Sequence, residues 1–488
     1  MGQSLRFAKT TMKDCPMTAI TPEQLAFVNA RPALAGALSA LIDELTHVDT
    51  ASLSPESFAR VESELGDRVQ TLGSQVIGEV LRDAAATTPV VEYGDCFWEA
   101  LAPSALHATT RFGPVTVMRS LYRRIGRGTR PTIDPVTLRC GLFESMTPAC
   151  SALVGAMVAI TTSREAARLL RHVGLRGCSR STIERHGQAL GAALESQREA
   201  LEDALIVEYE LPEGAVALSV SVDRITLPMR EPKPRPVGRP RKGAPKHPID
   251  VKFRMAYVGC WTLHDAEGNA LYTCRYGRMP GEGGQHCVEE QLRFDVEALV
   301  EAHPHLKVAT LADGAPEMLQ MLERITANVA VTARLVDFWH ASEYLGAALT
   351  TLPVDTKCEL RRLKESLLNS HRGVQKVLLK LRTWEAECSG IPPEALQDAI
   401  RYFENKKSQM GYAAARATKL PVGSGHVEAT AKTLVTMRMK RSGCRWNRVS
   451  GQHVLTLRSL WCSSRWEVAT EWLVSSRDAD GQPIREIA

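Results

Sequence analysis

The segment at 214–229, GAVALSVSVDRITLPM, is the stretch that sets the expected fold. Apolar residues alternate in it with small or polar ones, which is the period of a β-strand: Val216, Leu218, Val220 and Val222. Asp223 comes where this strand is expected to end. Two more strand-like segments follow at 253–265 and 270–278, with Gly and Asn turn signals between them. The pattern predicts an antiparallel meander of three strands with a carboxylate at the end of the first.

Beyond the meander, helix and strand patterns alternate. A helix is expected over 286–303, and two short strands are expected to end at Asp313 and at Asp337. A three-stranded meander followed by this alternation is the element order of a ribonuclease H-like sheet. The expected fold class is therefore an α/β ribonuclease H-like catalytic core, interrupted by an all-helical insertion and preceded by helical and helix-turn-helix DNA-binding regions.

A third acid belongs to the segment LPVGSGHVEATAK at 420–432, where Glu428 begins what is expected to be the last helix of the core. Taken alone, this glutamate could complement the helix dipole, and Asp313 before a glycine could be a turn residue. Taken together, Asp223, Asp313 and Glu428 would converge from the first strand, the fourth strand and the last helix. Carboxylate oxygens are the ligands that Mg²⁺ prefers, with Mn²⁺ as a substitute, and paired metal ions need such a set. We predict that the three acids are catalytic and bind metal.

Several blocks of the sequence resemble a known family. The blocks are SVDR, LADGAPEML, LVDFWHASEYL and LPVGSGHVEATAKTLVTMRMKRSGCRW. They are similar to successive blocks of the ISKra-type bacterial insertion-sequence transposases, relatives of the Mutator-like DDE enzymes, from about residue 112 to the C-terminus. The resemblance implies that the catalytic acids are Asp223, Asp313 and Glu428. It also implies an accessory active-site role for Asp337 and His340, which match the Asp-x-x-His motif of Mutator-like enzymes.

The function that this resemblance implies is DNA transposition. The protein would bind the terminal inverted repeats of an insertion sequence as double-stranded DNA, cleave the strands with two metal ions, and join them to target DNA. It would work as a homo-oligomer on DNA and would not bind a membrane. Two alternatives stay open: a transposase-derived DNA-binding regulator without catalysis, and a ribonuclease H-like nuclease that performs no strand transfer.

A helix-turn-helix is predicted from two capping-box helix starts, Thr162-x-x-Glu165 and Ser181-x-x-Glu184, joined by a short turn that contains glycine. The second helix would present four side chains to DNA: Arg180, Thr182, Arg185 and His186. A basic helical hairpin without a DNA role is the alternative.

Two further basic segments are candidates for DNA contact. The Pro-rich segment at 228–248 contains VGRPRKG, which resembles an AT-hook, so its residues would either enter the minor groove or touch phosphates: Arg239, Arg241 and Lys242. From 429 to 466 the chain has no Asp or Glu, and its predicted DNA contacts are Arg438, Lys440, Arg441, Arg445 and Trp446. For Trp446, packing in the core is the alternative to stacking on a base.

Composition agrees with a protein made of several domains. The chain has 488 residues, a formal net charge of +5 and 12 cysteines with no Cys-x-x-Cys pair. This argues against a zinc ribbon and a secreted disulfide framework, and a cytoplasmic, nucleoid-associated location is expected. The predicted segments are a helical N-terminal region (1–110), a basic β-hairpin region (111–145), the helix-turn-helix region (146–210), the first part of the core (211–350), the helical insertion (351–420) and the C-terminal part of the core (421–488).

Overall fold

A computed structural model describes residues 20–487 apart from 127, 129, 175–177, 208, 234–242, 244–248 and 479–482. The chain forms two compact units. The first consists of Met1–Cys150, Arg168–Cys178 and Asp480–Ala488, and the second of Ser151–Ala167 and Ser179–Ala479. The division falls within two helices, α5 (Pro148–Ile160) and α6 (Ser163–His172).

The first unit begins with three helices, as the apolar spacing predicts: α1 (Pro22–Asn29), α2 (Pro32–Thr46) and α3 (Pro55–Asp83), with a 3₁₀ turn at Thr50–Ser52. Thr21 and Ser54 cap α1 and α3 through capping boxes, and a proline stands at the first position of each. Within the described residues no single helix is long and apolar enough to cross a membrane, while the bent pair α1 and α2 passes that test by length and composition alone.

Strands begin earlier in the first unit than the expected helical region to residue 110 allows. A five-stranded antiparallel sheet has the order β12-β1-β2-β5-β6, formed by β1 (Val90–Tyr93), β2 (Cys96–Ala100), β5 (Tyr122–Arg124), β6 (Thr132–Ile133) and β12 (Arg485–Ile487). The predicted basic hairpin is β3 (Ser104–Thr110) paired with β4 (Gly113–Arg119), and α4 (Pro135–Arg139) follows the strands. Val115 and Val117 are buried in it, and Leu121 lies outside it. Arg119 is held in an ion pair with Asp134 at 2.9 Å.

The second unit is built on a five-stranded sheet of order β11-β10-β7-β8-β9. Its strands are β7 (Ala217–Pro232), β8 (Ile249–His264), β9 (Ala270–Arg278), β10 (Lys307–Ala312) and β11 (Val331–Val336). The predicted meander is confirmed, because β7, β8 and β9 pair in antiparallel register. The two later strands lie on the other side of β7 and run parallel to it, with α9 (Gly284–Ala302) and α10 (Pro316–Ile325) in the connections.

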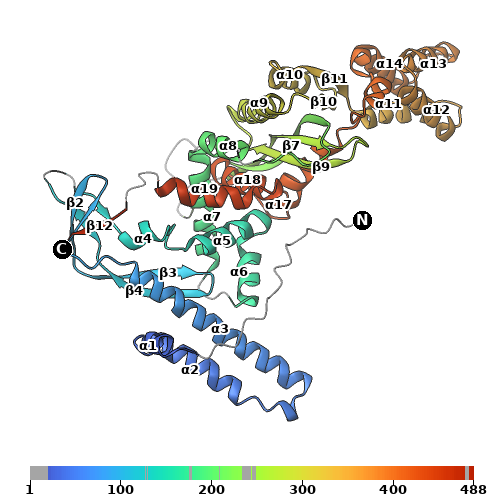
Figure 1. The fold of residues 1–488 in the computed structure, drawn as a ribbon. Coiled ribbons are helices and arrows are strands. Elements are labelled where there is room, and N and C mark those ends of the chain that lie inside the picture. Colours follow the sequence, from blue (N-terminus) through green and yellow to red (C-terminus); the bar gives the residue numbers. More distant parts are fainter. Residues whose placement is uncertain are drawn as a thin grey trace. The chain divides into compact units, whose positions relative to one another are not determined.

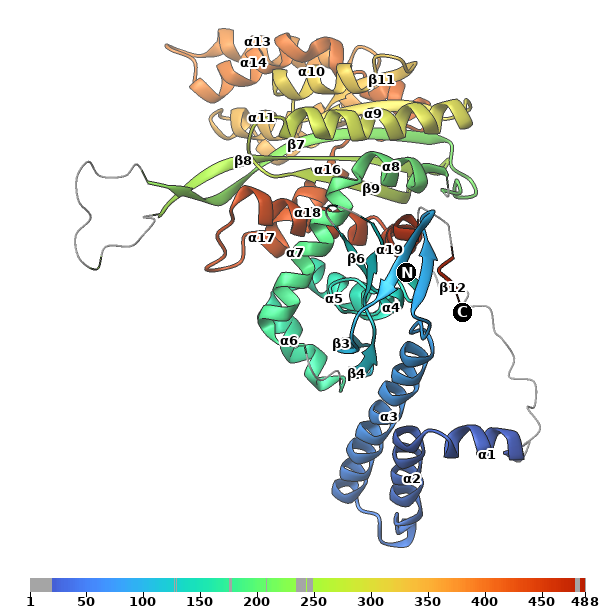
Figure 2. The same cartoon turned by 90° about the vertical axis from the view of Figure 1, so that its left-hand side faces the viewer.

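The expectation that β7 ends at Asp223 is wrong. β7 continues for nine residues beyond it, because β8 pairs with it without interruption from Ala217↔His264 to Pro232↔Ile249. What ends near Asp223 is the pairing with β10, whose last pair is Leu311↔Ser221. Figure 2 shows the remainder of β7 and β8 leaving the sheet as a two-stranded ribbon.

Helices cover both faces of the sheet (Figure 1). α9 and α10 bury one face, where Leu218, Val220 and Val222 of β7 pack. On the other face pack α16 (Gly425–Thr430), the π-helix Ala431–Thr436 and α17 (Met437–Met439), over apolar residues of the ribbon base such as Leu227 and Val258. Two helices follow the predicted last helix, α18 (Arg448–Cys462) and α19 (Trp466–Ser475), and a 3₁₀ turn at Ser476–Asp478 ends the unit. Before the sheet come α7 (Arg180–Ser196) and α8 (Arg198–Val207).

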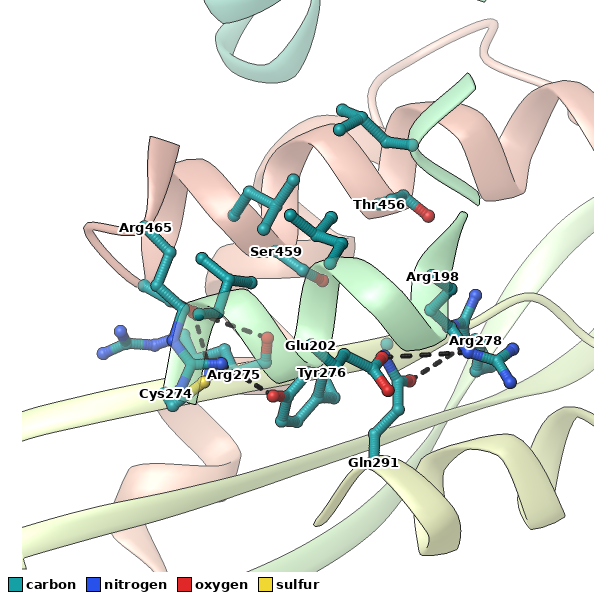
Figure 3. Close-up of a pocket in the computed structure, with 16 residues that line it drawn as sticks. Arg198, Glu202, Cys274, Arg275, Tyr276, Arg278, Gln291, Thr456, Ser459 and Arg465 are labelled. Atoms are coloured by element: carbon teal, nitrogen blue, oxygen red, sulfur yellow. Dashed lines mark hydrogen bonds and ion pairs between the residues drawn. The ribbon is translucent and has the colours of Figure 1, made fainter. Parts of the chain in front are cut away.

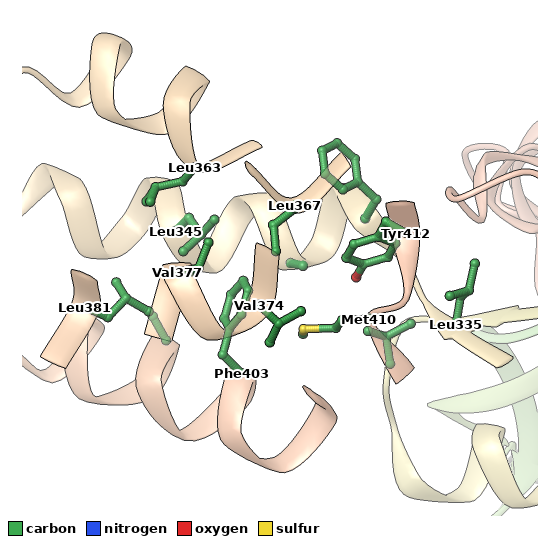
Figure 4. Close-up of a cluster of buried hydrophobic side chains, with 14 of the residues drawn as sticks. Leu335, Leu345, Leu363, Leu367, Val374, Val377, Leu381, Phe403, Met410 and Tyr412 are labelled. Carbon is green, nitrogen blue, oxygen red and sulfur yellow. The ribbon is translucent and has the colours of Figure 1, made fainter. Parts of the chain in front are cut away.

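Between β11 and α16 the elements are helical: α11 (Phe338–Thr350), α12 (Thr356–Asn369), α13 (Gly373–Glu387), α14 (Glu394–Lys406), a 3₁₀ turn (Lys407–Gln409) and α15 (Tyr412–Ala417). Their apolar side chains form one core that includes Leu345, Leu367 and Phe403 (Figure 4). This core also includes Ala309, Leu311 and Leu335 of the sheet. The helices at 338–417 are therefore packed onto the ends of β10 and β11.

The helical core allows a matched test of packing on α13. Leu381 is fully buried and Leu379 is 71% exposed on the same helix. We expect Leu381→Ala to lower the free energy of unfolding by about 2–5 kcal/mol, because it leaves a cavity, and Leu379→Ala to change it by less than about 0.5 kcal/mol. Urea denaturation of both variants measures the difference. Equal, small effects would show that α13 does not pack as described.

Candidate active site

Asp223 lies in β7, and Asp313 directly follows β10, the parallel neighbour of β7. Leu311 pairs with Ser221, and each aspartate is two residues further along the chain. Because side chains alternate between the two faces of a sheet, Asp313 shares a face with Ala309 and Leu311. Asp223 is likewise on the face opposite to Val222. Both aspartates are half-buried.

Glu428 reaches this same face from α16. The helix is held by Val427, which is 2% exposed and packs with the apolar residues of the ribbon base. The ring of His426 lies 5.2 Å from that of His264, whose Nε2 is 2.8 Å from Ser219 Oγ on β7. Glu428 itself is exposed. The next turn of the helix is a π-helix, a local irregularity that is frequent at functional sites.

Several of the predicted site residues affect the pKa of Asp223. The pKa of Asp223 is raised above its ordinary value, first by burial and then by the negative charges of Asp313 and Glu428. The backbone N–H of Arg224, which donates to Asp223 Oδ1 at 2.6 Å, and the nearby His340 oppose this rise. Three other sequence-predicted residues therefore act on the charge of Asp223: Asp313, Glu428 and His340.

Asp337 is the fifth predicted site residue, and its carboxylate is fully engaged by backbone groups. It is 1% exposed. Oδ1 accepts the N–H groups of Trp339 and His340 and so caps α11, and Oδ2 accepts the N–H of Ser424. Asp337 is thus a residue that positions the helix of His340 and the loop before Glu428. His340 is partly exposed, with Nδ1 3.0 Å from Glu343 Oε2.

The prediction that the three acids bind a metal ion depends on their carboxylate oxygens, which are suitable metal ligands. After burial, the negative charges of Asp313 and Glu428 also raise the pKa of Asp223, and a hard divalent cation would stabilise such a set of carboxylates. Asp223 Oδ1 and Asp313 Oδ1 each accept one backbone N–H, from Arg224 and Ala315. In the part of the chain that the structure describes, no group of three or more His, Cys, Asp or Glu is close enough to hold a metal ion. The residues therefore suit Mg²⁺ in kind, and binding would require them to draw closer.

Several arginines of the acid-free segment at 429–466 are buried, so part of the predicted DNA-contact surface is wrong. Arg438 is 4% exposed and donates from Nε to Val158 O at 3.1 Å, while burial lowers its pKa to about 10. Arg458 and Arg465 are buried as well. Arg438 is therefore not a DNA contact, because its guanidinium satisfies a carbonyl in the interior.

The other predicted contacts of this segment have mixed outcomes. Arg441 is bound in a bidentate ion pair to Glu165, with both distances 2.6 Å. Trp446 donates from Nε1 to Met439 O at 2.8 Å and packs against the apolar residues of the ribbon base. This favours the core-packing alternative. Arg445 and Lys440 are exposed, and Lys440 Nζ is 3.4 Å from Thr226 Oγ1. These last two stay available to DNA.

The second helix of the predicted helix-turn-helix is α7. Its N-cap is Ser179, which accepts the N–H of Thr182 at 3.1 Å, so the predicted start at Ser181 is wrong by two residues. Arg180 and Arg185 are exposed, as predicted. His186 is not presented to solvent, because it is 2% exposed and its Nε2 lies 2.9 Å from Ser151 Oγ. The AT-hook-like residues Arg239, Arg241 and Lys242 lie outside the described residues.

A separate polar cluster is made by α7, α8, β9, α9 and α18 (Figure 3). In it Glu202 is hydrogen-bonded to Gln291, and burial raises the pKa of Glu202 to about 7. Arg278 donates to Glu195, and Arg465 donates to Tyr276 Oη at 2.7 Å. Its polar groups largely satisfy one another, so we assign this cluster to packing between α8, α18 and the sheet.

Sequence reasoning did not single out Trp339 or Gly423, which border the acids. Trp339 is 57% exposed, and a Cβ on Gly423 would lie 3.0 Å from its Cδ1 and Nε1 atoms. Its position two residues after Asp337 was the available signal for Trp339. Nothing in the sequence marks the second, because the contact joins residues 84 positions apart.

Comparisons with known proteins add little. No protein-family model and no curated protein matches the chain. Among solved structures, a Mos1 transposase paired-end complex with the left transposon end matches with 14% identity and a TM-score of 0.16, over 54% of this chain and 78% of that one. A mariner Mos1 paired-end complex with Mg matches over the same shares with 16% identity and a TM-score of 0.15. Similarity at these TM-scores does not identify the function of this chain.

The raised pKa of Asp223 is expected to affect the free energy of unfolding. Since its pKa is raised in the folded state, the native protein binds more protons here than the unfolded chain, and the ionised carboxylate costs stability above its ordinary pKa of 3.8. We therefore expect Asp223→Asn to raise the free energy of unfolding at pH 7 without divalent cations, and this gain to fade as the pH falls towards 4.

Asp265→Asn is the control with the opposite sign. The pKa of Asp265 is lowered by its hydrogen bond with Asn269, so its ionised form stabilises the fold and its loss should destabilise the protein at pH 7. Urea denaturation at the two pH values measures both variants. Destabilisation by Asp223→Asn at pH 7 would contradict the crowding of like charges.

Proposed function

We propose that the protein is a DDE transposase of a bacterial insertion sequence, of the ISKra type, with a ribonuclease H-like core. The observation that carries the proposal is that the charges of Asp313, Glu428 and His340 all act on the half-buried carboxyl of Asp223. The strand order of the sheet and the resemblance of the sequence blocks support it. In this reading the helices α12–α15 are the insertion within the core.

The proposed chemistry is cleavage of a phosphodiester at the ends of the element and attack of the freed 3′-hydroxyl on target DNA. Asp223, Asp313 and Glu428 would hold two Mg²⁺, which when bound activate the attacking oxygen and stabilise the leaving one. His340 would face the scissile phosphate from the start of α11. Asp337 would keep that helix and the Glu428 loop in place through its backbone hydrogen bonds.

Double-stranded DNA is the proposed partner, as terminal inverted repeats and as target, and the active form would be a homo-oligomer on DNA. The exposed cations Arg180 and Arg185 on α7, with Lys440 and Arg445 near the base of the ribbon, are the proposed phosphate contacts among the described residues. The basic loop that joins β7 and β8 would add Arg239, Arg241 and Lys242.

The first test removes each acid in turn. Asp223→Asn, Asp313→Asn and Glu428→Gln should each abolish Mg²⁺-dependent cleavage of labelled terminal-repeat DNA, because each removes a ligand charge with little change in volume. DNA binding should stay within several-fold of the wild type. Asp265→Asn, at the turn between β8 and β9, is the isosteric control and should keep cleavage.

The results of this assay separate the candidate functions. Binding without any cleavage by the wild type would favour a DNA-binding regulator. Cleavage without joining of the labelled 3′-end to a target plasmid would favour a nuclease. Near-full cleavage by one of the three variants would remove that residue from the site.

A second test concerns α7. Replacing Arg180 and Arg185 with Ala should weaken DNA binding and lower the slope of log K against log salt by about one unit for each lost phosphate contact. Arg382→Ala is the control, since its guanidinium is held by Glu385 and Glu404. Titration at several salt concentrations gives the slopes. If the double variant and the Arg382→Ala control have equal slopes, Arg180 and Arg185 do not contact phosphates, and α7 has a structural role only.

A further inference from the structure

Trp339 is a large apolar side chain that the fold leaves open to solvent. It is 57% exposed, whereas its neighbour Phe338 is 2% exposed in the core of the helices at 338–417. Leaving most of an indole in water forgoes the stabilisation that its burial would give. The exposure is therefore a reason to look for something that covers the ring.

The ring of Trp339 is nevertheless held in one orientation. Its Cδ1 and Nε1 edge lies against Gly423, where a Cβ would come within 3.0 Å. The ring of Phe338 stands edge-on to it with centroids 5.4 Å apart, and Lys364 Nζ on α12 lies 4.4 Å from the ring centroid. Because these contacts fix the indole in advance, a planar group that stacks on it pays little ordering entropy.

Backbone hydrogen bonds link the segment of Trp339 to the segments that carry the acids. The N–H of Trp339 donates to Asp337, and the N–H of Asp337 donates to Ala312 O, next to Asp313, at 2.8 Å. The N–H of Phe338 donates to Val422 O at 3.0 Å, in the loop that leads to Glu428. The following residue, His340, acts on the charge of Asp223. Trp339 thus stands at the rim of the proposed active site.

The nearby aromatic Tyr344 provides a contrast. It is 39% exposed, but its ring stacks on Tyr402 with centroids 4.1 Å apart and an angle of 14° between the planes. One face of Tyr344 is therefore already covered. Among the described residues no stacked ring covers Trp339: Phe338 stands edge-on to it, and the ammonium group of Lys364 lies close to the ring. Trp339 therefore combines an open aromatic surface with a positive charge, and these are the two groups that recognise one nucleotide.

We propose that Trp339 and Lys364 bind one unpaired nucleotide of the DNA substrate beside the acids. Its base stacks on the indole and its phosphate faces the ammonium group of Lys364. This inference rests on the proposed function. Paired bases inside a duplex hide their faces, so the site selects a nucleotide that has left the stack. Gly423 acts as a positioning residue, because any side chain there would push the indole away.

The experiment measures binding without cleavage. The probe is a forked DNA, a 20-base-pair duplex with single-stranded arms, in EDTA at fixed salt, compared with the same duplex without arms. An abasic site replaces, in turn, each of the first three unpaired nucleotides. Full-length wild type, Trp339→Ala, Trp339→Phe, Lys364→Met and Gly423→Ala are titrated. Trp461→Ala is the control, since Trp461 is 38% exposed on α18, away from the acids.

We expect Trp339→Ala to bind the intact fork about tenfold more weakly than the wild type, and one abasic position to cost the wild type about the same. That abasic site should cost Trp339→Ala nothing more, because both changes remove the same contact. Trp339→Phe should keep part of the affinity, and Gly423→Ala should lose affinity without losing the ring. Lys364→Met should weaken binding to the fork and lower its salt slope. The duplex without arms and the Trp461→Ala control should show no such loss.

The outcomes separate this inference from the proposed function. If wild type binds the fork but Trp339→Ala binds it equally well, or if the abasic and Trp339→Ala losses simply add, the nucleotide site is overturned while the transposase proposal stands. If wild type binds neither DNA, the proposed function and the nucleotide site both fail. Cleavage plays no part in the readout, so inactivity of the metal site leaves the result unaffected.

Discussion

The buried carboxylate of Asp337 is the interaction on which the arrangement of the candidate site depends. Its oxygens accept the N–H groups of Trp339 and His340 at the start of α11 and of Ser424 before α16. Its own N–H donates to Ala312 at the end of β10. A charge taken out of water is costly unless such donors surround it, so the folded chain has to bring these segments together. These hydrogen bonds of Asp337 hold the end of β10, next to Asp313, in place relative to the loop that precedes Glu428.

A second constraint works against the first. Burial and the negative charges of Asp313 and Glu428 raise the pKa of Asp223, so its ionised carboxylate is unfavourable there. Proteins keep such an unfavourable cluster where its charge serves a purpose, most often the binding of a cation or a reacting group. The two constraints explain why Asp337 and the three acids differ in surroundings although all are carboxylates near strand or helix ends. The carboxylate of Asp337 accepts three backbone N–H groups, whereas Asp223 and Asp313 each accept one from the described residues.

The cationic side chains of the C-terminal segment also fall into two groups, one buried in the fold and one exposed. Arg438 and Arg458 donate to Val158 O and Ala159 O, carbonyls of α5, and so bind α17 and α18 to that helix. Their long side chains serve the packing of the fold. Arg445 and Lys440 of the same run are exposed. A run of arginines without acids is therefore a mixture, and burial and ion pairing distinguish the arginines that hold the fold from the cations that can meet a phosphate.

Local patterns in the sequence determined the meander of β7, β8 and β9, the helix starts at Thr162 and near Ser181, and the three acids as candidates. These features follow from period, turn residues and caps, which act over a few positions. The sequence did not determine that β7 runs nine residues past Asp223, since a strand continues wherever a partner such as β8 continues. Nor did it determine that Arg438 and His186 are buried, or that Gly423 makes room for Trp339. Those outcomes depend on contacts between residues distant in the chain, and only the tertiary structure decides them.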